Sequence, residues 1–147
     1  MHRQIRLLKL VSTATLLLFA SGCGSGSKAY VDLKSSHVAT VAGLYSQFQA
    51  ANRGRFPKDD SDFKKYINST HKGTLEKMGL ATADDLLKSD RDGQPIKILY
   101  GKHGMTPDML EVIAHEEVGV GGMRLVAFRG GGYEEYDEQQ FGQIKMK

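Results

Sequence analysis

The chain has 147 residues, of which 40% are hydrophobic and 25% charged, with a formal net charge of +3 and one cysteine. This length fits one domain of ordinary size. A single cysteine excludes a fold held by internal disulfides. The first 22 residues contain Arg3, Arg6 and Lys9 and no acid, so the remainder is close to neutral. A basic surface is therefore not expected, and nucleic acid is excluded as a predicted partner.

The first 22 residues have the order of a secretory signal peptide. The basic start is followed by a mostly apolar run from Leu10 to Ala20 and then by Ser21 and Gly22. A positive segment, a short apolar segment and small residues are typical of a cleaved signal. The apolar run is shorter than the roughly 20 residues that span a bilayer core. An uncleaved membrane anchor is the alternative interpretation.

Cys23 follows this segment directly. An odd cysteine in an exported chain indicates an intermolecular bridge, a free thiol or a modified thiol. The stretch Leu16–Cys23 resembles the lipobox of bacterial lipoproteins, with Ala20 where that family prefers leucine. The resemblance implies a thioether-linked diacylglycerol on Cys23, cleavage before it, and acylation of the new amino group with a chain such as palmitate. More than one acyl chain gives durable anchoring. The alternative is a secreted protein with an unmodified cysteine.

The predicted organisation has three parts. Residues 1–22 form the signal peptide, residues 23–28 form the lipidated cysteine with a Gly/Ser tether, and residues 29–147 form one globular domain. Gly/Ser linkers behave as flexible coil. The lipid anchor places the domain outside the cytoplasm, in the cell envelope, on the cell membrane or the outer membrane.

The first half of the domain is predicted to be helical. Residues 35–52 form the clearest helix, with a start capped by Ser35 or Ser36 and an end before Gly54 and Pro57. Its apolar residues recur at three- and four-residue steps, which places one stripe against a core: Val38, Val41, Ala42, Tyr45, Phe48 and Ala51. Shorter helical segments are predicted after residues 60–62, over 74–78 and over 82–87.

The second half is predicted to form strands. These cover residues 96–100, 110–118, 123–128 and 133–136, with the glycine-rich residues 119–122 closing a hairpin. Asp137 is expected to cap a last helical turn. The predicted fold class is therefore α+β, with a long N-terminal helix packed on a small antiparallel sheet of three or four strands, after a cleaved signal peptide.

This order of motifs resembles the soluble domain of type II secretion pseudopilins and related pilin-like proteins. The matching residues lie at the end of the long helix and in the turn before the first strand: Tyr45, Asn52, Gly54, Phe56 and Pro57, then Asp90, Asp92, Gly93 and Pro95. The chain has no tryptophan where that family has one, and a lipobox-like stretch stands in place of its apolar assembly helix. The resemblance implies a pilin-like domain with a binding or structural role on a lipid anchor.

One group of residues suggests metal chemistry. Strand alternation places His115 and Glu117 on one face, and with His103 they would offer two imidazoles and a carboxylate. The spacing is not His-Glu-x-x-His, and an ordinary solvent-facing strand with an ion pair is the favoured interpretation.

Three further patterns suggest weaker candidates. Asp90 and Asp92 with Gly93 form half of a calcium loop, but a polar turn is favoured. The acids of residues 134–138 suit a solvated face better than general acid–base work. Residues 129–132 are glycine-rich without the lysine of a phosphate loop, so a hairpin end is favoured over an anion-binding nest.

No nucleophile or catalytic motif is recognised, so the chain is predicted not to be an enzyme and to need no cofactor. The predicted function is a lipid-anchored envelope protein with a non-catalytic binding or structural role. Its predicted partners are the membrane, through Cys23, and another envelope protein. The alternative is a small envelope enzyme or metal-binding protein that uses His103, His115 and Glu117.

Overall fold

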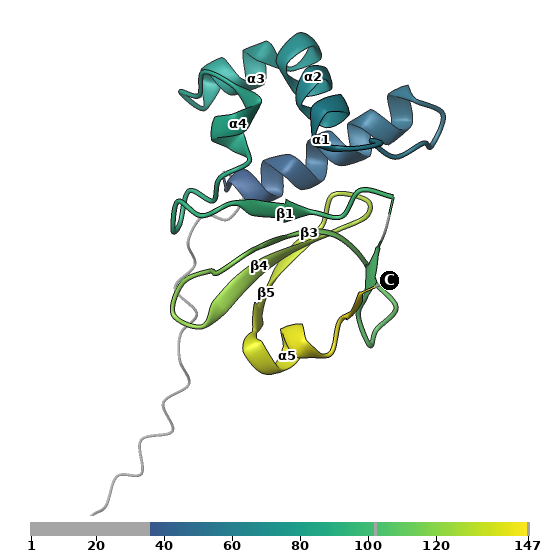
Figure 1. Ribbon diagram of the computed structural model, residues 1–147, viewed down its shortest axis with the longest axis vertical. Coiled ribbons are helices and arrows are strands. Elements are labelled where there is room, and N and C mark those ends of the chain that lie inside the picture. The colour runs from purple at the N-terminus through teal and green to yellow at the C-terminus, as the bar shows by residue number, and fades with distance from the viewer. Residues whose placement is uncertain (1–35, 102, 147) are drawn as a thin grey trace, which may run out of the picture. The chain divides into compact units, whose positions relative to one another are not determined.

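The computed structural model describes residues 36–101 and 103–146, which fall within one compact unit, residues 31–147. The predicted signal peptide, Cys23 and the tether lie outside the described residues. The described part is a mixed α+β domain with an antiparallel sheet, as predicted. Helices α1 to α4 lie on one side of the sheet and the short helix α5 lies on the other (Figure 1).

Helix α1 (His37–Ala51) lies directly on the sheet and contacts β3 and β4. Ser36 caps its start, because the Ser36 Oγ accepts a hydrogen bond from the Ala39 N–H at 3.1 Å. The helix ends where Arg53 and Gly54 adopt left-handed backbone angles, with φ values of 55° and 79°. Glycine reaches this region at little cost, and the turn redirects the chain toward Phe56.

Three short helices form a second layer above α1: α2 (Asp60–Thr70), α3 (Lys72–Lys77) and α4 (Ala83–Leu86). Asp59 caps α2, and a Thr82–Asp85 capping box begins α4. Phe63 of α2 packs edge-on against Tyr45, with ring centroids 5.6 Å apart. This aromatic contact fastens the second layer to α1.

The sheet has six antiparallel strands, in the order β5-β4-β3-β2-β6 with β1 also paired to β3. Their bounds are β1 (Ile96–Ile98), β2 (Gly104–Met105), β3 (Glu111–Glu116), β4 (Met123–Phe128), β5 (Tyr133–Asp137) and β6 (Lys145–Met146). One edge of β3 pairs with β4, and the other is shared, because Ile96 pairs with Glu116 and Gly104 pairs with Val112. Helix α5 (Glu138–Gly142) follows β5.

The predicted count of three or four strands was wrong. Strands β2 and β6 have two residues each, too few to show the alternation that identifies a strand in sequence. Gly104 permits their pairing, since a Cβ there would lie 2.8 Å from the Ile144 Cγ2. A larger residue at position 104 would push β6 away from the sheet.

Apolar side chains fill both faces of the sheet. The larger cluster lies between the sheet and the helical layer and includes Tyr45, Phe63, Ile113 and Leu125, all fully buried. The smaller cluster lies on the α5 face: Val112, Val126, Phe128, Tyr136 and Ile144. A shift of register between Val112 and Ala114 marks a bulge that lets β3 serve both clusters.

Candidate functional site

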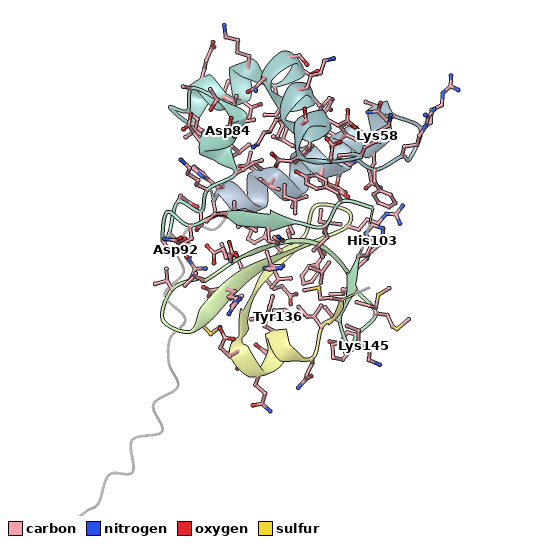
Figure 2. The ribbon with its side chains drawn as sticks, viewed as in Figure 1. Lys58, Asp84, Asp92, His103, Tyr136 and Lys145 are labelled. Carbon is pink, nitrogen blue, oxygen red and sulfur yellow. The ribbon has the colours of Figure 1, made fainter. Side chains whose placement is uncertain are left out.

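The three residues of the alternative metal-binding hypothesis line one pocket beside α5. The pocket has a volume of about 480 Å³ and is lined by Lys97, Leu99, His103, His115, Glu117, Arg124 and Met146. His115 and Glu117 therefore share a face of the sheet, as strand alternation predicts. Figure 2 labels His103, on the segment that leads into β2.

The two imidazoles serve different parts of the fold. The Nδ1 of His103 lies 3.0 Å from the Glu111 Oε1, and its ring lies 4.4 Å from the Phe56 ring. The Nδ1 of His115 lies 2.8 Å from the Glu116 carbonyl oxygen, and its ring packs edge-on against Phe141. Within residues 36–101 and 103–146, no three His, Cys, Asp or Glu side chains lie together in a way that would hold a metal ion.

The prediction of a solvent-facing strand was wrong for His115, which is 8% exposed. Burial lowers the pKa of His115, because the charged imidazolium loses its hydration; the Glu116 carbonyl opposes this shift in part. Nearby Arg124 and Lys97 lower the pKa further, whereas Glu117 raises it. The ring is thus a neutral packing element under α5, and Glu117 alone of the pair is exposed.

The Asp90–Asp92 turn is a structural clamp. The Asp90 Oδ1 accepts a hydrogen bond from the His37 N–H at 3.0 Å, at the start of α1. The two Asp92 oxygens accept from the Gln94 N–H and the Gly119 N–H, each at 2.8 Å. These carboxylates are occupied by backbone donors, which supports the polar-turn interpretation over a calcium loop.

Between these two aspartates begins an ionic network that the sequence did not predict. Glu116 is fully buried, and its Oε1 accepts a hydrogen bond from the Ser89 hydroxyl at 2.5 Å. Its Oε2 accepts from the Leu125 N–H at 2.8 Å. The Arg91 Nη1 lies 3.5 Å from that Oε2 and 2.9 Å from the Glu135 Oε1, at angles that make the contacts ionic rather than aligned hydrogen bonds.

This network has a structural consequence. Ser89 and Arg91 precede β1, Glu116 ends β3 and Glu135 lies in β5, so the charges tie the turn to β3 and to β5. A buried carboxylate is tolerated only when it is paired and hydrogen-bonded. Glu116 meets both conditions and has no contact with solvent, so we interpret its role as stabilising the fold.

Three of the acids in residues 134–138 are likewise engaged, Glu135 through its pair with Arg91. Asp137 caps α5 by accepting from the Gln140 N–H at 2.7 Å, and Glu138 pairs with Arg124 at 2.7 Å. Arg129, in the predicted hairpin end, pairs with Glu111 at 3.0 Å and lies over the Phe56 ring. Gly131 donates its N–H to the Phe128 carbonyl, as a tight turn requires.

A second pocket lies between α1 and α2 and contains none of the predicted site residues. We call it the helical groove; its volume is about 390 Å³, and it is lined by Phe48, Asn52, Arg55, Phe56, Lys58, Asp62, Lys65, Tyr66 and Ser69. Aromatic side chains form its buried and half-buried part, and the basic side chains are exposed. Figure 2 labels Lys58, on the segment between the two helices.

The basic residues of the helical groove differ from the neighbouring lysines. Lys64, on the other side of α2, lies 2.5 Å from Asp60 and 2.6 Å from Asp84. Among the residues with described positions, neither Lys58 nor Lys65 forms an ion pair. Arg55 forms none in that part of the chain either. The sequence does contain a sign of this groove, because Arg55, Lys58 and Lys65 are interspersed with aromatic residues. Only the packing of α1 on α2 shows that these residues lie together.

No protein-family model, curated protein or solved structure gives a significant match to this chain. The resemblances to lipoproteins and pseudopilins therefore remain predictions. Among the described residues, no helix has both the length and the apolar character needed to cross a membrane.

Proposed function

We propose that this chain is a lipid-anchored protein of the cell envelope whose domain has a binding or structural role. The observation that carries the proposal is Cys23, the single cysteine, placed directly after a basic start, a short apolar run and two small residues. Acylation of Cys23 accounts for an otherwise unexplained thiol in an exported chain.

The domain supports a non-catalytic role through what its charged groups do. Asp90 and Asp92 receive backbone N–H groups, and Glu116 is sealed among Ser89, Arg91 and Leu125. Catalytic carboxylates need access to a substrate, whereas these groups hold segments of the fold together. The metal-binding alternative has only the shared pocket in its favour, because the described side chains do not fit a metal ion.

The pilin-like part of the proposal rests on residues with clear local roles. Gly54 has the left-handed angle that ends α1, and Phe56 returns to stack on Tyr45 and His103. The turn at Asp90–Asp92 then holds the start of α1. These motifs support a domain in which one helix is fixed to a sheet at both ends. A lipid anchor in place of an assembly helix favours tethering over polymerisation.

The anchor is tested by labelling cells with an alkyne analogue of palmitate. We expect the wild-type chain to be labelled and to fractionate with membranes, and Cys23→Ser to lose both properties. The matched control is the double variant Cys23→Ser/Ser25→Cys, which keeps one thiol but moves it two positions. Labelling of the double variant at the wild-type level would show that any thiol near this end is acylated. Equal labelling of wild type and Cys23→Ser would remove the proposal.

A further inference from the structure

We propose that the helical groove binds an acidic, partly apolar peptide segment of a partner protein. This inference rests on the proposed binding role and names the chemistry of the partner. It is carried by three features of the groove: its charge, its aromatic floor and the state of its backbone N–H groups.

The charge of the groove is unbalanced. Arg55, Lys58 and Lys65 line it against a single carboxylate, that of Asp62. The Asp62 Oδ2 already accepts a hydrogen bond from the Lys58 backbone N–H at 3.1 Å, so it serves the loop before α2. Carboxylates of a ligand would therefore meet three cations that form no ion pair among the described residues. Such complementarity steers association and fixes the register of a partner.

The floor of the groove is aromatic. Phe48 is 6% exposed and contacts Tyr66 edge-on, with ring centroids 5.0 Å apart. Phe56 and Tyr66 are half-buried, so part of each ring faces the groove. Aromatic and arginine side chains are the residues enriched at protein interfaces and at their energetic centres. An apolar side chain of the partner would fill this floor while acidic neighbours reach the basic rim.

The backbone argues for a peptide over a phosphate ion. Phosphate sites use free backbone N–H groups at a loop or a helix start. Here the Asn52 N–H donates to Phe48, the Gly54 N–H to Gln49, and the Arg55 N–H to Asn52. The start of α2 is covered by its own acids, Asp59 and Asp60. The groups available to a ligand are therefore the cationic side chains of Arg55, Lys58 and Lys65. Cations on long side chains suit carboxylates that are spaced along an extended peptide.

The same acids argue against an anionic bilayer as the occupant. A membrane presents a plane of negative charge, to which a uniformly basic surface is attracted. Asp59, Asp60 and Asp62 lie within a few residues of the basic rim, at the start of α2. A negative plane would also meet Asp59 and Asp60, which do not line the groove, whereas a peptide held within the groove meets the Asp62 carboxylate alone.

The test is fluorescence anisotropy with the full chain in detergent micelles and a labelled peptide of four Glu-Leu repeats. The matched peptide replaces each glutamate by glutamine. We expect the acidic peptide to bind, the glutamine peptide to bind at least about tenfold more weakly, and added salt to weaken the acidic complex. The variant Lys58→Glu/Lys65→Glu should weaken acidic-peptide binding by about tenfold or more. The control Lys77→Glu/Lys145→Glu reverses two exposed charges outside the groove, on α3 and β6, and changes the net charge as much as the groove variant does. It should change acidic-peptide binding by less than about twofold.

Three outcomes would overturn the inference. The first is no binding of the acidic peptide by the wild-type chain. The second is equal weakening by Lys77→Glu/Lys145→Glu and by the groove variant, which would indicate non-specific attraction to net charge. The third is groove-dependent binding of inorganic phosphate or of phosphatidylglycerol vesicles without peptide binding, which would assign the groove to another occupant. Palmitate labelling of the same variants reports the Cys23 anchor separately, so failure of the groove and failure of the anchor are distinguishable.

Discussion

The two charged regions of this domain contrast in how their charges are satisfied. On the sheet, Glu116 is fully buried and surrounded by Ser89, Arg91 and a backbone N–H. In the helical groove, Lys58 and Lys65 stand exposed around an aromatic floor, without ion pairs in the described part of the chain. A charge that is buried must be paired within the fold, whereas an exposed one is free to meet a ligand. The sequence presents both as ordinary charged residues, so burial is what separates their roles.

The largest expected effect comes from breaking the buried network. Glu116→Ala removes the acceptor for Ser89 and Leu125 and leaves the Arg91 guanidinium without its buried partner. We expect the free energy of unfolding to fall by about 3–5 kcal/mol in urea titrations. Its neighbour Glu117 is exposed, so Glu117→Ala should stay within about 0.5 kcal/mol of wild type. Equal losses in the two variants would mean that burial does not distinguish Glu116 from its exposed neighbour.

A smaller effect is expected at the turn before β1. Asp92→Ala removes the carboxylate that receives the Gln94 and Gly119 N–H groups, and the β3–β4 hairpin loses one of its links to the turn, while those through Ser89 and Arg91 remain. We expect a loss of about 1–2 kcal/mol, measured by thermal unfolding. Asp108→Ala changes an exposed aspartate in the turn before β3 and should shift stability by less than about 0.5 kcal/mol. A neutral Asp92→Ala would mean that the hairpin holds the turn without this carboxylate.

The smallest effect concerns pH. Burial lowers the pKa of His115 from 6.5, so the unfolded chain binds more protons than the folded chain at pH values just below 6.5. The stability that the neutral His115 ring contributes should therefore be fully present above this range. The free energy of unfolding should fall as the pH decreases from 6.5 toward the lowered pKa. His71, whose pKa burial also lowers, adds to the same slope.

The measurement is urea unfolding at about pH 7.5 and about pH 5.5. His115→Gln should reduce the loss of stability between the two conditions, and His71→Gln should reduce it independently. If His115→Gln keeps the full wild-type loss, then His115 is charged in the folded state and the account of its burial fails.

Local patterns were sufficient for much of the fold. The apolar stripe from Val38 to Phe48 predicts α1, and the glycines at 119–122 predict the β3–β4 hairpin, because both signals lie within a few residues. Strands β2 and β6 were missed because two-residue strands carry no period. The bulge at Ile113 was missed because it depends on which face each neighbour packs against.

The sites were predicted less well, for a related reason. Ser89 and Glu116 are 27 residues apart, and the local sequence around each residue does not predict their hydrogen bond. His103 and His115 were weighed as joint metal ligands only as an alternative to an ordinary strand, and each is held by a different partner. Tertiary packing decides which polar residues meet, and composition alone does not report it.

The free edge of β5 has a consequence for how copies of this domain meet. Among residues 36–101 and 103–146, strand β5 pairs with β4 alone, so its outer backbone N–H and C=O groups form a template for another strand. Glu134, Glu135 and Asp137 place negative charge along this template. Two such edges repel each other, which acts against strand-to-strand association into fibrils or insoluble aggregates. The acids of β5 therefore act against edge-to-edge pairing at this end of the described sheet.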